Sequence, residues 1–136
     1  MKKILITGAL GHIGSKLIHH FQPGDFEQIN LIDNLSTQRF VSLFNLPEQV
    51  NFKFVEGDIL KMDLVKQLIN IDCVIHLAAI TNAEGSYERQ EEVEQVNFYG
   101  TKLIAEACLK TKTKMIFLST TSVYGMQDEV VDENCP

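Results

Sequence analysis

The chain has 136 residues, of which 45% are apolar and 22% charged, so it is long and apolar enough to bury the core of one domain. These fractions argue against a disordered or fibrous protein. The 12 basic and 18 acidic side chains give a formal net charge of −6, which argues against nucleic acid or an anionic membrane surface as a partner. The net charge does not exclude a small anionic ligand, because backbone N–H groups can bind such a ligand.

The cysteines give no sign of a structural cross-link. Cys73, Cys108 and Cys135 are far apart and show no Cys-x-x-Cys spacing, so we expect neither a disulfide framework nor a metal site. The apolar run after the two N-terminal lysines is too short for a signal peptide, and no apolar stretch approaches the length of a membrane span. We therefore expect a protein of the reducing cytoplasm, away from membranes.

Strand and helix signals alternate along the chain. Short runs of branched apolar residues predict buried strands over residues 4–7, 28–33, 52–56, 73–77 and 114–119. Helical spacing of apolar residues predicts helices over 13–21, 60–69 and 86–110, and a short helix over 40–45 is a further candidate. This alternation implies an α/β fold of the Rossmann type, a doubly wound parallel sheet. A complete fold of this kind has six strands, so we expect the order 3-2-1-4-5, cut after the fifth strand, in one domain over residues 1–136.

A glycine-rich turn follows the first predicted strand. Gly8, Gly11 and Gly14 form the pattern Gly-x-x-Gly-x-x-Gly, a variant of the dinucleotide fingerprint. Gly8 can make the tight turn, Gly11 can let a pyrophosphate approach the backbone, and Gly14 can let helix and strand pack closely. The helix that begins near His12 and Ile13 offers free N–H groups to the phosphates. Three glycines can also simply build a turn, but the preceding strand and following helix favour the dinucleotide interpretation.

Two aspartates follow predicted strands. Asp33 ends the second strand, where a carboxylate can accept hydrogen bonds from both ribose hydroxyls and would repel the 2′-phosphate of NADP. It predicts NAD rather than NADP as cofactor, the alternative being an aspartate that caps a turn. Asp58 ends the third strand and can accept from the adenine amine, with the N–H of Ile59 serving a ring nitrogen. A plain turn aspartate fits Asp58 equally well.

These features belong to a longer set of ordered motifs. Together they resemble the extended short-chain dehydrogenase/reductase family, and within it the NAD-dependent nucleotide-sugar epimerases and dehydratases of the UDP-glucose 4-epimerase kind. The motifs occupy residues 7–14, 33–36, 57–59, 76–79, 96–101 and 119–125, so the resemblance covers essentially the whole chain.

The resemblance implies a cofactor cleft at the end of the fourth strand. Leu77, Ala78 and Ala79 would line it, with the two alanines keeping the wall small enough for the dinucleotide to pass. Asn34 would contact the cofactor beside Asp33. Small residues at this place can also serve ordinary packing.

The resemblance also assigns roles near the nicotinamide. Asn97 would bond to backbone near the active site and hold it open, although a partly exposed helix asparagine is the plain alternative. Ser119 falls on a cofactor-contacting position. Thr120 falls on the family's catalytic serine or threonine, whose hydroxyl would bond the sugar oxygen being oxidised. His76 lies in an apolar strand, and we expect a hydrogen-bonded core histidine there.

The chain departs from the family in its general base. The family uses Tyr-x-x-x-Lys, in which the lysine lowers the pKa of the tyrosine. None of the tyrosines here has a lysine four residues on; the followers are Glu91, Leu103 and Asp128. Thr81 stands where epimerases often have a lysine. In the family, the tyrosine motif and the substrate-binding region both lie beyond the length of this chain.

We therefore expect the NAD-binding part of a nucleotide-sugar epimerase or dehydratase that works by transient hydride transfer to NAD. On its own the fragment should be inactive. The expected partners are a nucleotide-sugar substrate and a second copy of the chain, paired through the long helix or the edge of the fifth strand. The alternatives are a non-catalytic NAD-sensing domain and a dehydrogenase or reductase that releases NADH at each turnover.

Overall fold

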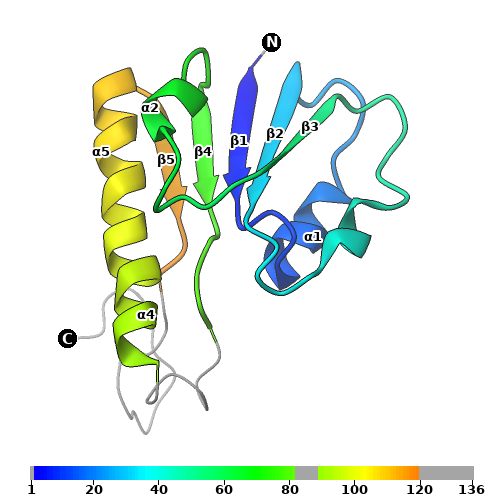
Figure 1. The fold of residues 1–136 in the computed structure, drawn as a ribbon. Coiled ribbons are helices and arrows are strands. Elements are labelled where there is room, and N and C mark those ends of the chain that lie inside the picture. The colour runs from blue at the N-terminus through cyan, green and yellow to red at the C-terminus, as the bar shows by residue number, and fades with distance from the viewer. Residues whose placement is uncertain (1, 82–88, 120–136) are drawn as a thin grey trace, which may run out of the picture.

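The fold is a parallel sheet of five strands flanked by helices, seen in a computed structural model that describes residues 2–81 and 89–119 (Figure 1). Its strand order is β3-β2-β1-β4-β5, and all four neighbouring pairs are parallel. This confirms the expected doubly wound topology. The strands are β1 (Lys3–Thr7), β2 (Gln28–Asp33), β3 (Phe52–Glu56), β4 (Cys73–His76) and β5 (Lys114–Phe117).

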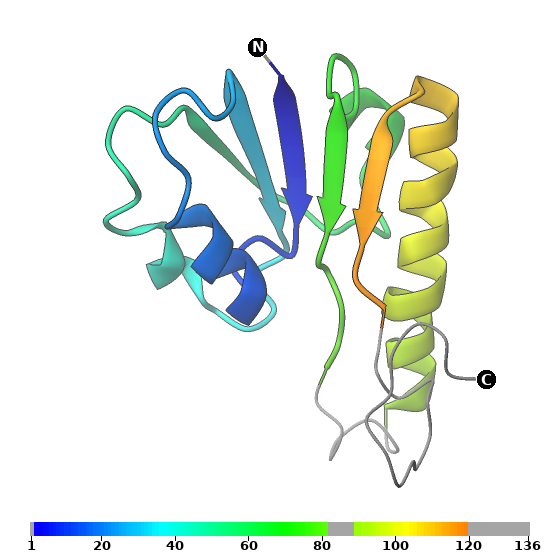
Figure 2. The same ribbon diagram turned by 180° about the vertical axis from the view of Figure 1, so that it is seen from behind.

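The central strands are apolar because both faces of the sheet are covered. Along β1, Ile4 and Ile6 belong to a core cluster with the helix α1 (His12–Ile18), whereas Leu5 belongs to a second cluster with α2 (Leu64–Gln67) and α5 (Thr101–Thr111). Successive side chains of a strand point to opposite faces, so a continuous apolar run is what a strand between two layers requires. Figures 1 and 2 show α1 on one face and α2 with α5 on the other.

Two helices are shorter than the sequence predicts. The first ends at Ile18 rather than near residue 21, and Ile13, expected on its apolar face, is 59% exposed. The second spans only Leu64–Gln67, because Asp63 caps it by accepting the N–H of Lys66 (3.0 Å). Residues 60–63, predicted to be helical, form turns instead. The candidate helix over 40–45 is a short 3₁₀ helix, η1 (Phe40–Leu43).

The long helix contains a change of helical type that the sequence does not signal. It runs through α4 (Gln90–Glu94), a π-helical segment η2 (Gln95–Gly100) and α5. Its expected start at 86–88 lies outside the described residues. Gly100 lies directly on the turn after β3, where an added Cβ would come within 2.8 Å of Ile59 Cδ1. None of the helices within residues 2–81 and 89–119 combines the length and apolar character that crossing a membrane requires.

The fifth strand is an edge of the sheet as described. It ends at Phe117 and not at Ser119, just as β4 ends at His76 and not at Leu77. Ile116 and Phe117 are each about half exposed. Apolar side chains at an unpaired edge are a surface on which further protein can pack.

Candidate functional site

The candidate site lies at the carboxyl ends of the strands, between β1 and β4. The chain leaves β1 towards β2 on one side and reaches β4 and β5 on the other, so the strand order reverses here. Open parallel sheets bind ligands at such a switch point, outside the carboxyl ends of the strands. Figure 2 shows the two segments that follow β1 and β4 parting at this place.

The three glycines of the turn after β1 differ in what surrounds them. Gly8 has a φ of +64° and lies against the segment after β4, where an added Cβ would be 2.5 Å from the N of Ala78. At Gly14 an added Cβ would be 2.5 Å from the carbonyl oxygen of Ala9. At Gly11 the same atom would meet only the carbonyl oxygen of Gly8, at 3.3 Å. The fold itself therefore requires glycine at two of these positions, while Gly11 faces space that a ligand can use.

The N-terminus of α1 has no side-chain cap. Gly11 is its N-cap residue and has no side chain that could accept the N–H groups of the first turn. His12 and Ile13 are both exposed, so the site's mouth carries an apolar side chain that the core does not use. The helix has seven residues, so its dipole is small and the amide N–H groups matter more for an anion.

Asp33 joins two loops of the site. Its Oδ2 accepts the N–H of Leu10 in the glycine turn (3.0 Å), and its Oδ1 accepts the N–H of Leu35 (3.0 Å). A carboxylate has about four lone-pair sites, so both oxygens can accept further hydrogen bonds. Asn34 is exposed and accepts the N–H of Ser36 (3.1 Å). The aspartate thus caps a turn and keeps the capacity to bind ribose hydroxyls.

Asp58 has a more local role. Its Oδ1 accepts the N–H of Leu60 (2.9 Å), and its Oδ2 lies 3.4 Å from Lys61 Nζ. Its carbonyl oxygen accepts the N–H groups of Lys61 and Met62. The neighbouring Ile59 is buried in the core. These contacts account for Asp58 as a turn residue, the plainer of the two interpretations that the sequence left open.

The segment after β4 is held by contacts from both sides. Leu77 donates its N–H to the carbonyl oxygen of Thr7 (3.0 Å). Ala78 is half-buried and Ala79 exposed. Asn97 pairs with the backbone of the next residue, Ile80: its Oδ1 accepts the N–H (2.8 Å) and its Nδ2 donates to the carbonyl oxygen (2.9 Å). Asn97 therefore bonds to backbone, as the resemblance implies, and positions the wall rather than presenting its own amide.

His76 is a buried, hydrogen-bonded histidine, as expected. It is 2% exposed; its Nδ1 is 2.6 Å from Thr7 Oγ1 and its Nε2 is 3.0 Å from Thr101 Oγ1. Burial lowers its pKa to about 4, so the ring is neutral near neutral pH. Both threonines lie in the ordered motifs, but no role was predicted for either of them. A threonine at the end of a fully apolar strand, with no turn residue before it, was the available signal for Thr7.

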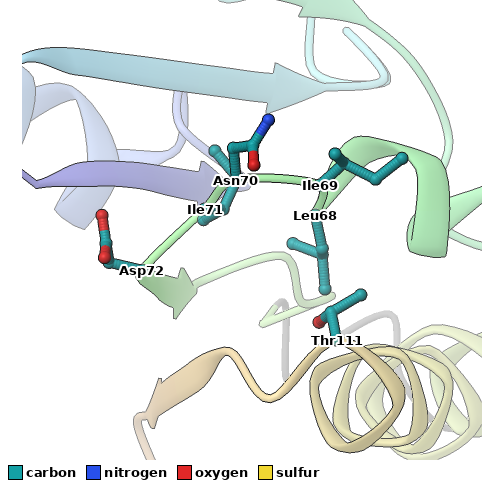
Figure 3. A pocket seen from close by; sticks show the side chains of 6 residues that line it. All are labelled: Leu68, Ile69, Asn70, Ile71, Asp72 and Thr111. Atoms are coloured by element: carbon teal, nitrogen blue, oxygen red, sulfur yellow. The ribbon is translucent and has the colours of Figure 1, made fainter.

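Two further features bear on the extent of the site. Ser119, expected to contact the cofactor, is exposed, and Thr120, the expected catalytic residue, lies outside the described residues. A separate hollow is lined by Leu68, Ile69, Asn70, Ile71, Asp72 and Thr111 (Figure 3). Its residues precede β4 and β5, so it lies at the amino ends of the strands, away from the glycine turn.

Comparison with known proteins decides the family. A model of the NAD dependent epimerase/dehydratase family matches residues 4–136. The chain belongs to this family. The match extends over nearly the whole sequence, and the family is the one that the ordered motifs resemble.

Individual relatives of the family are longer than this chain. A trifunctional UDP-glucose 4,6-dehydratase/UDP-4-keto-6-deoxy-D-glucose 3,5-epimerase/UDP-4-keto-L-rhamnose-reductase of Arabidopsis thaliana is 38% identical over 138 residues, which covers 94% of this chain and 20% of that protein. The dTDP-D-glucose 4,6-dehydratase of Homo sapiens is 35% identical over 143 residues, covering 99% of this chain and 41% of that protein. The chain thus spans less than half the length of these relatives.

Solved structures of family members share the fold closely. The UDP-Glc/GlcNAc 4-epimerase from Campylobacter jejuni superposes with a TM-score of 0.89 at 32% identity, over 100% of this chain and 43% of the other. The UDP-glucuronic acid 4-epimerase from Bacillus cereus, in complex with UDP-glucuronic acid and NAD, gives a TM-score of 0.87 at 34% identity, over 98% and 45%.

Proposed function

We propose that this chain is the NAD-binding part of an NAD-dependent nucleotide-sugar epimerase or dehydratase. The observation that carries the proposal is the contrast within the glycine turn. Gly8 and Gly14 are required by the protein's own backbone, whereas a Cβ added at Gly11 would meet a single atom, the carbonyl oxygen of Gly8 at 3.3 Å. A glycine that internal packing does not require, at a strand-to-helix turn beside the switch point, fits a pyrophosphate that approaches the backbone closely.

The residues of the site divide by the part of NAD that they would hold. The glycine turn would take the pyrophosphate, the end of β2 the adenosine ribose, the turn after β3 the adenine, and the segments after β4 and β5 the nicotinamide half. The residues that would contact NAD are Gly8, Gly11, His12, Ile13, Gly14, Asp33, Asn34, Ile59 through its N–H, Leu77, Ala78, Ala79 and Ser119. Asp58 and Asn97 would belong to the site by shaping the turn after β3 and the wall after β4. When bound, NAD would supply hydride acceptance from a sugar carbon and its later return. Thr120 would bond the sugar oxygen at which that oxidation occurs.

Preference for NAD over NADP follows from Asp33. Its two oxygens already accept backbone N–H groups, so the carboxylate is fixed in place and cannot turn away from a 2′-phosphate. The fixed negative charge would repel that phosphate, whereas the free lone pairs would accept the ribose hydroxyls of NAD.

The substrate class comes from the relatives. Those compared above act, by their names, on UDP-sugars and a dTDP-sugar. We extend this class to the whole protein, and we place the region that binds the sugar nucleotide outside residues 1–136. The domain as a whole then belongs to the extended short-chain dehydrogenase/reductases, and this chain by itself would not turn over substrate. An NAD sensor is not favoured, because the relatives are named as enzymes. A simple reductase is not favoured, because the relative whose name includes a reductase is also named as a dehydratase and an epimerase.

Two further properties extend the proposal. The protein would pair with a second copy through the long helix, on which Phe98, Tyr99 and Leu103 are exposed apolar side chains. It would reside in the cytoplasm, where Cys73 and Cys108, both free thiols, would stay reduced.

Titration calorimetry with NAD and with NADP tests the proposal. The unaltered chain should bind NAD at least about tenfold more tightly than NADP, since a charge-assisted hydrogen bond contributes roughly 1.5–3 kcal/mol. Incubation with NAD and UDP-glucose should give no product above a control without protein. Equal affinity for the two cofactors would remove the role of Asp33, and absence of NAD binding would overturn the proposed function.

A further inference from the structure

Three polar side chains form a hydrogen-bonded chain in the interior, between the sheet and the long helix. Thr7 at the end of β1 and His76 at the end of β4 are buried, and Thr101 at the start of α5 is partly buried. Thr7 and His76 lie side by side in the parallel register of β1 and β4. These three hydrogen-bonded side chains thus connect β1 and β4, at the switch point, to the helix that covers them.

The backbone groups at the two ends of this hydrogen-bonded series fix the direction of each bond in it. Thr101 Oγ1 donates to the carbonyl oxygen of Asn97 (2.7 Å), so it must accept from His76 Nε2 (3.0 Å). His76 therefore carries its proton on Nε2, and its Nδ1 accepts the hydroxyl proton of Thr7 (2.6 Å). Thr7 Oγ1 in turn accepts the N–H of Ala78 (3.4 Å). Only the neutral ring in this one tautomer satisfies every group.

The two ends of this series of hydrogen bonds meet at one segment, residues 78–80. One end is the N–H of Ala78, and the other is the backbone of Asn97, whose side chain holds both backbone groups of Ile80. Asn97 lies in the π-helical segment, four residues before Thr101. π-helical turns are frequent at functional sites, and here the turn directs both residues to the same contact.

We propose that His76 is a positioning residue that locks residues 78–80 against the long helix through Thr7 and Thr101. The role of this segment as a wall of the cofactor cleft rests on the proposed function. The role of His76 in fixing the segment does not depend on it. Within the described residues, the hydrogen bonds of the ring go to Thr7 and Thr101, neither of which is assigned to the cofactor. It acts by holding the small-residue wall at a set distance from the glycine turn, where Gly8 lies against Ala78.

Substitution at Thr101 tests the proposal with a matched pair. Thr101→Val keeps the shape of the side chain but removes the hydroxyl, whereas Thr101→Ser keeps the hydroxyl. Ile104→Val, a loss of one methyl group in the same helix and the same core, controls for general loosening of the domain. The readouts are amide hydrogen exchange at Ile80, the ¹⁵N shifts of the His76 ring, and NAD affinity.

We expect Thr101→Val to speed exchange at Ile80 and to weaken NAD binding by about tenfold each, the effect of losing roughly one well-made hydrogen bond. Thr101→Ser should restore both to within about twofold. In the unaltered chain the ring shifts should report a proton on Nε2 alone. The proposal would be overturned if Thr101→Val left exchange at Ile80 unchanged, or if Ile104→Val sped that exchange as much as Thr101→Val does. A His76 ring protonated on Nδ1 would also overturn it.

Failure of this proposal is distinguishable from failure of the proposed function. If the unaltered chain binds no NAD but Thr101→Val alone speeds exchange at Ile80, the function fails and the positioning role stands. If NAD binds and the exchange does not respond, the positioning role fails by itself.

Discussion

The turns that follow β1 and β3 both lead from a strand towards a helix, yet they are built in opposite ways. The aspartates of the turn after β3 bond locally: Asp58 accepts the N–H of Leu60, and Asp63 accepts that of Lys66. The outside contacts of this turn are the packing of Ile59 in the core and the hydrogen bond from the Gly57 N–H to the Asp33 carbonyl oxygen (2.9 Å). The turn after β1 depends on other segments, since Gly8 lies on Ala78.

The same dependence appears in the carboxylate that holds the turn after β1. Leu10 of that turn donates to Asp33, which comes from the end of β2. A turn held from outside can leave its own backbone free for a ligand, and a turn that caps itself cannot.

The largest effect should come from Gly14. Replacing it with valine would place Cβ within 2.6 Å of two backbone carbonyl oxygens, which cannot move aside as a side chain can. We expect a loss of at least about 3 kcal/mol of unfolding free energy, measured by chemical denaturation. Gly11→Val is the matched control, with an expected loss of only about 1 kcal/mol, because its Cβ would meet a single carbonyl oxygen at 3.3 Å and valine is a poorer N-cap residue than glycine. Equal destabilisation by the two would mean that the glycines of the turn are equivalent.

Acid should lower the free energy of unfolding through His76, which is hydrogen-bonded to Thr7 just before the turn after β1. The folded-state pKa is about 4, below the usual value of 6.5, so the unfolded chain takes up a proton that the folded chain does not. The stability that this group contributes is full above pH 6.5 and is lost as the pH falls towards 4, by up to about 3 kcal/mol.

The measurement is the unfolding free energy at several pH values, compared with His76→Gln, which cannot take up this proton. The two proteins should differ in slope between pH 4 and 6.5. Parallel curves would show that the ring takes up its proton as readily in the folded chain as in the unfolded chain, so that its pKa is not lowered by folding.

The two aspartates should respond differently in cofactor binding. Asp33→Asn keeps an acceptor for one N–H but loses the charge, so we expect NAD affinity to fall by about tenfold and the discrimination against NADP to be lost. Calorimetry with both cofactors measures this. Unaltered discrimination in Asp33→Asn would place its cause elsewhere.

Asp58→Ala should give the smallest effect, confined to stability. It removes the bond to Leu60 N–H and the ion pair with Lys61, whose side chain is 82% exposed and so contributes little. A loss of about 1 kcal/mol of unfolding free energy is expected, with NAD affinity within about twofold. A larger loss of affinity would show that this carboxylate contacts adenine, and the contrast between the two turns would then be wrong.

The sheet could be predicted because each strand is a short apolar run that needs no distant partner to be recognised. The helices were predicted less well. Asp63 stops the second helix from starting earlier, which a periodic pattern of apolar residues cannot show. The π-helical segment differs from an α-helix only in its hydrogen bonds, which reach one residue further along the backbone, and no residue type marks this difference in the sequence. Ile13 was expected on the apolar face of the first helix, although its side chain is 59% exposed.

The geometry of the candidate site could be predicted where local motifs define it and was missed where tertiary contacts do. The glycine pattern and Asp33 lie in one strand-turn-helix unit and the strand beside it. Thr7 and His76 are 69 residues apart, and His76 and Thr101 are 25 apart, so only the folded sheet brings them together. His76 was recognised as a buried histidine, but its partners could not be named from the sequence.

The central claim is that the turn after β1 keeps open space beside Gly11 for the pyrophosphate of NAD. The most direct test is calorimetric titration of Gly11→Val with NAD, alongside denaturation of the same protein. We expect a stability within about 1 kcal/mol of that of the unaltered chain and NAD affinity reduced by at least about a hundredfold, because the side chain would fill the ligand's place while its Cβ meets the fold only at the carbonyl oxygen of Gly8. Retained affinity in a folded Gly11→Val protein would contradict the account.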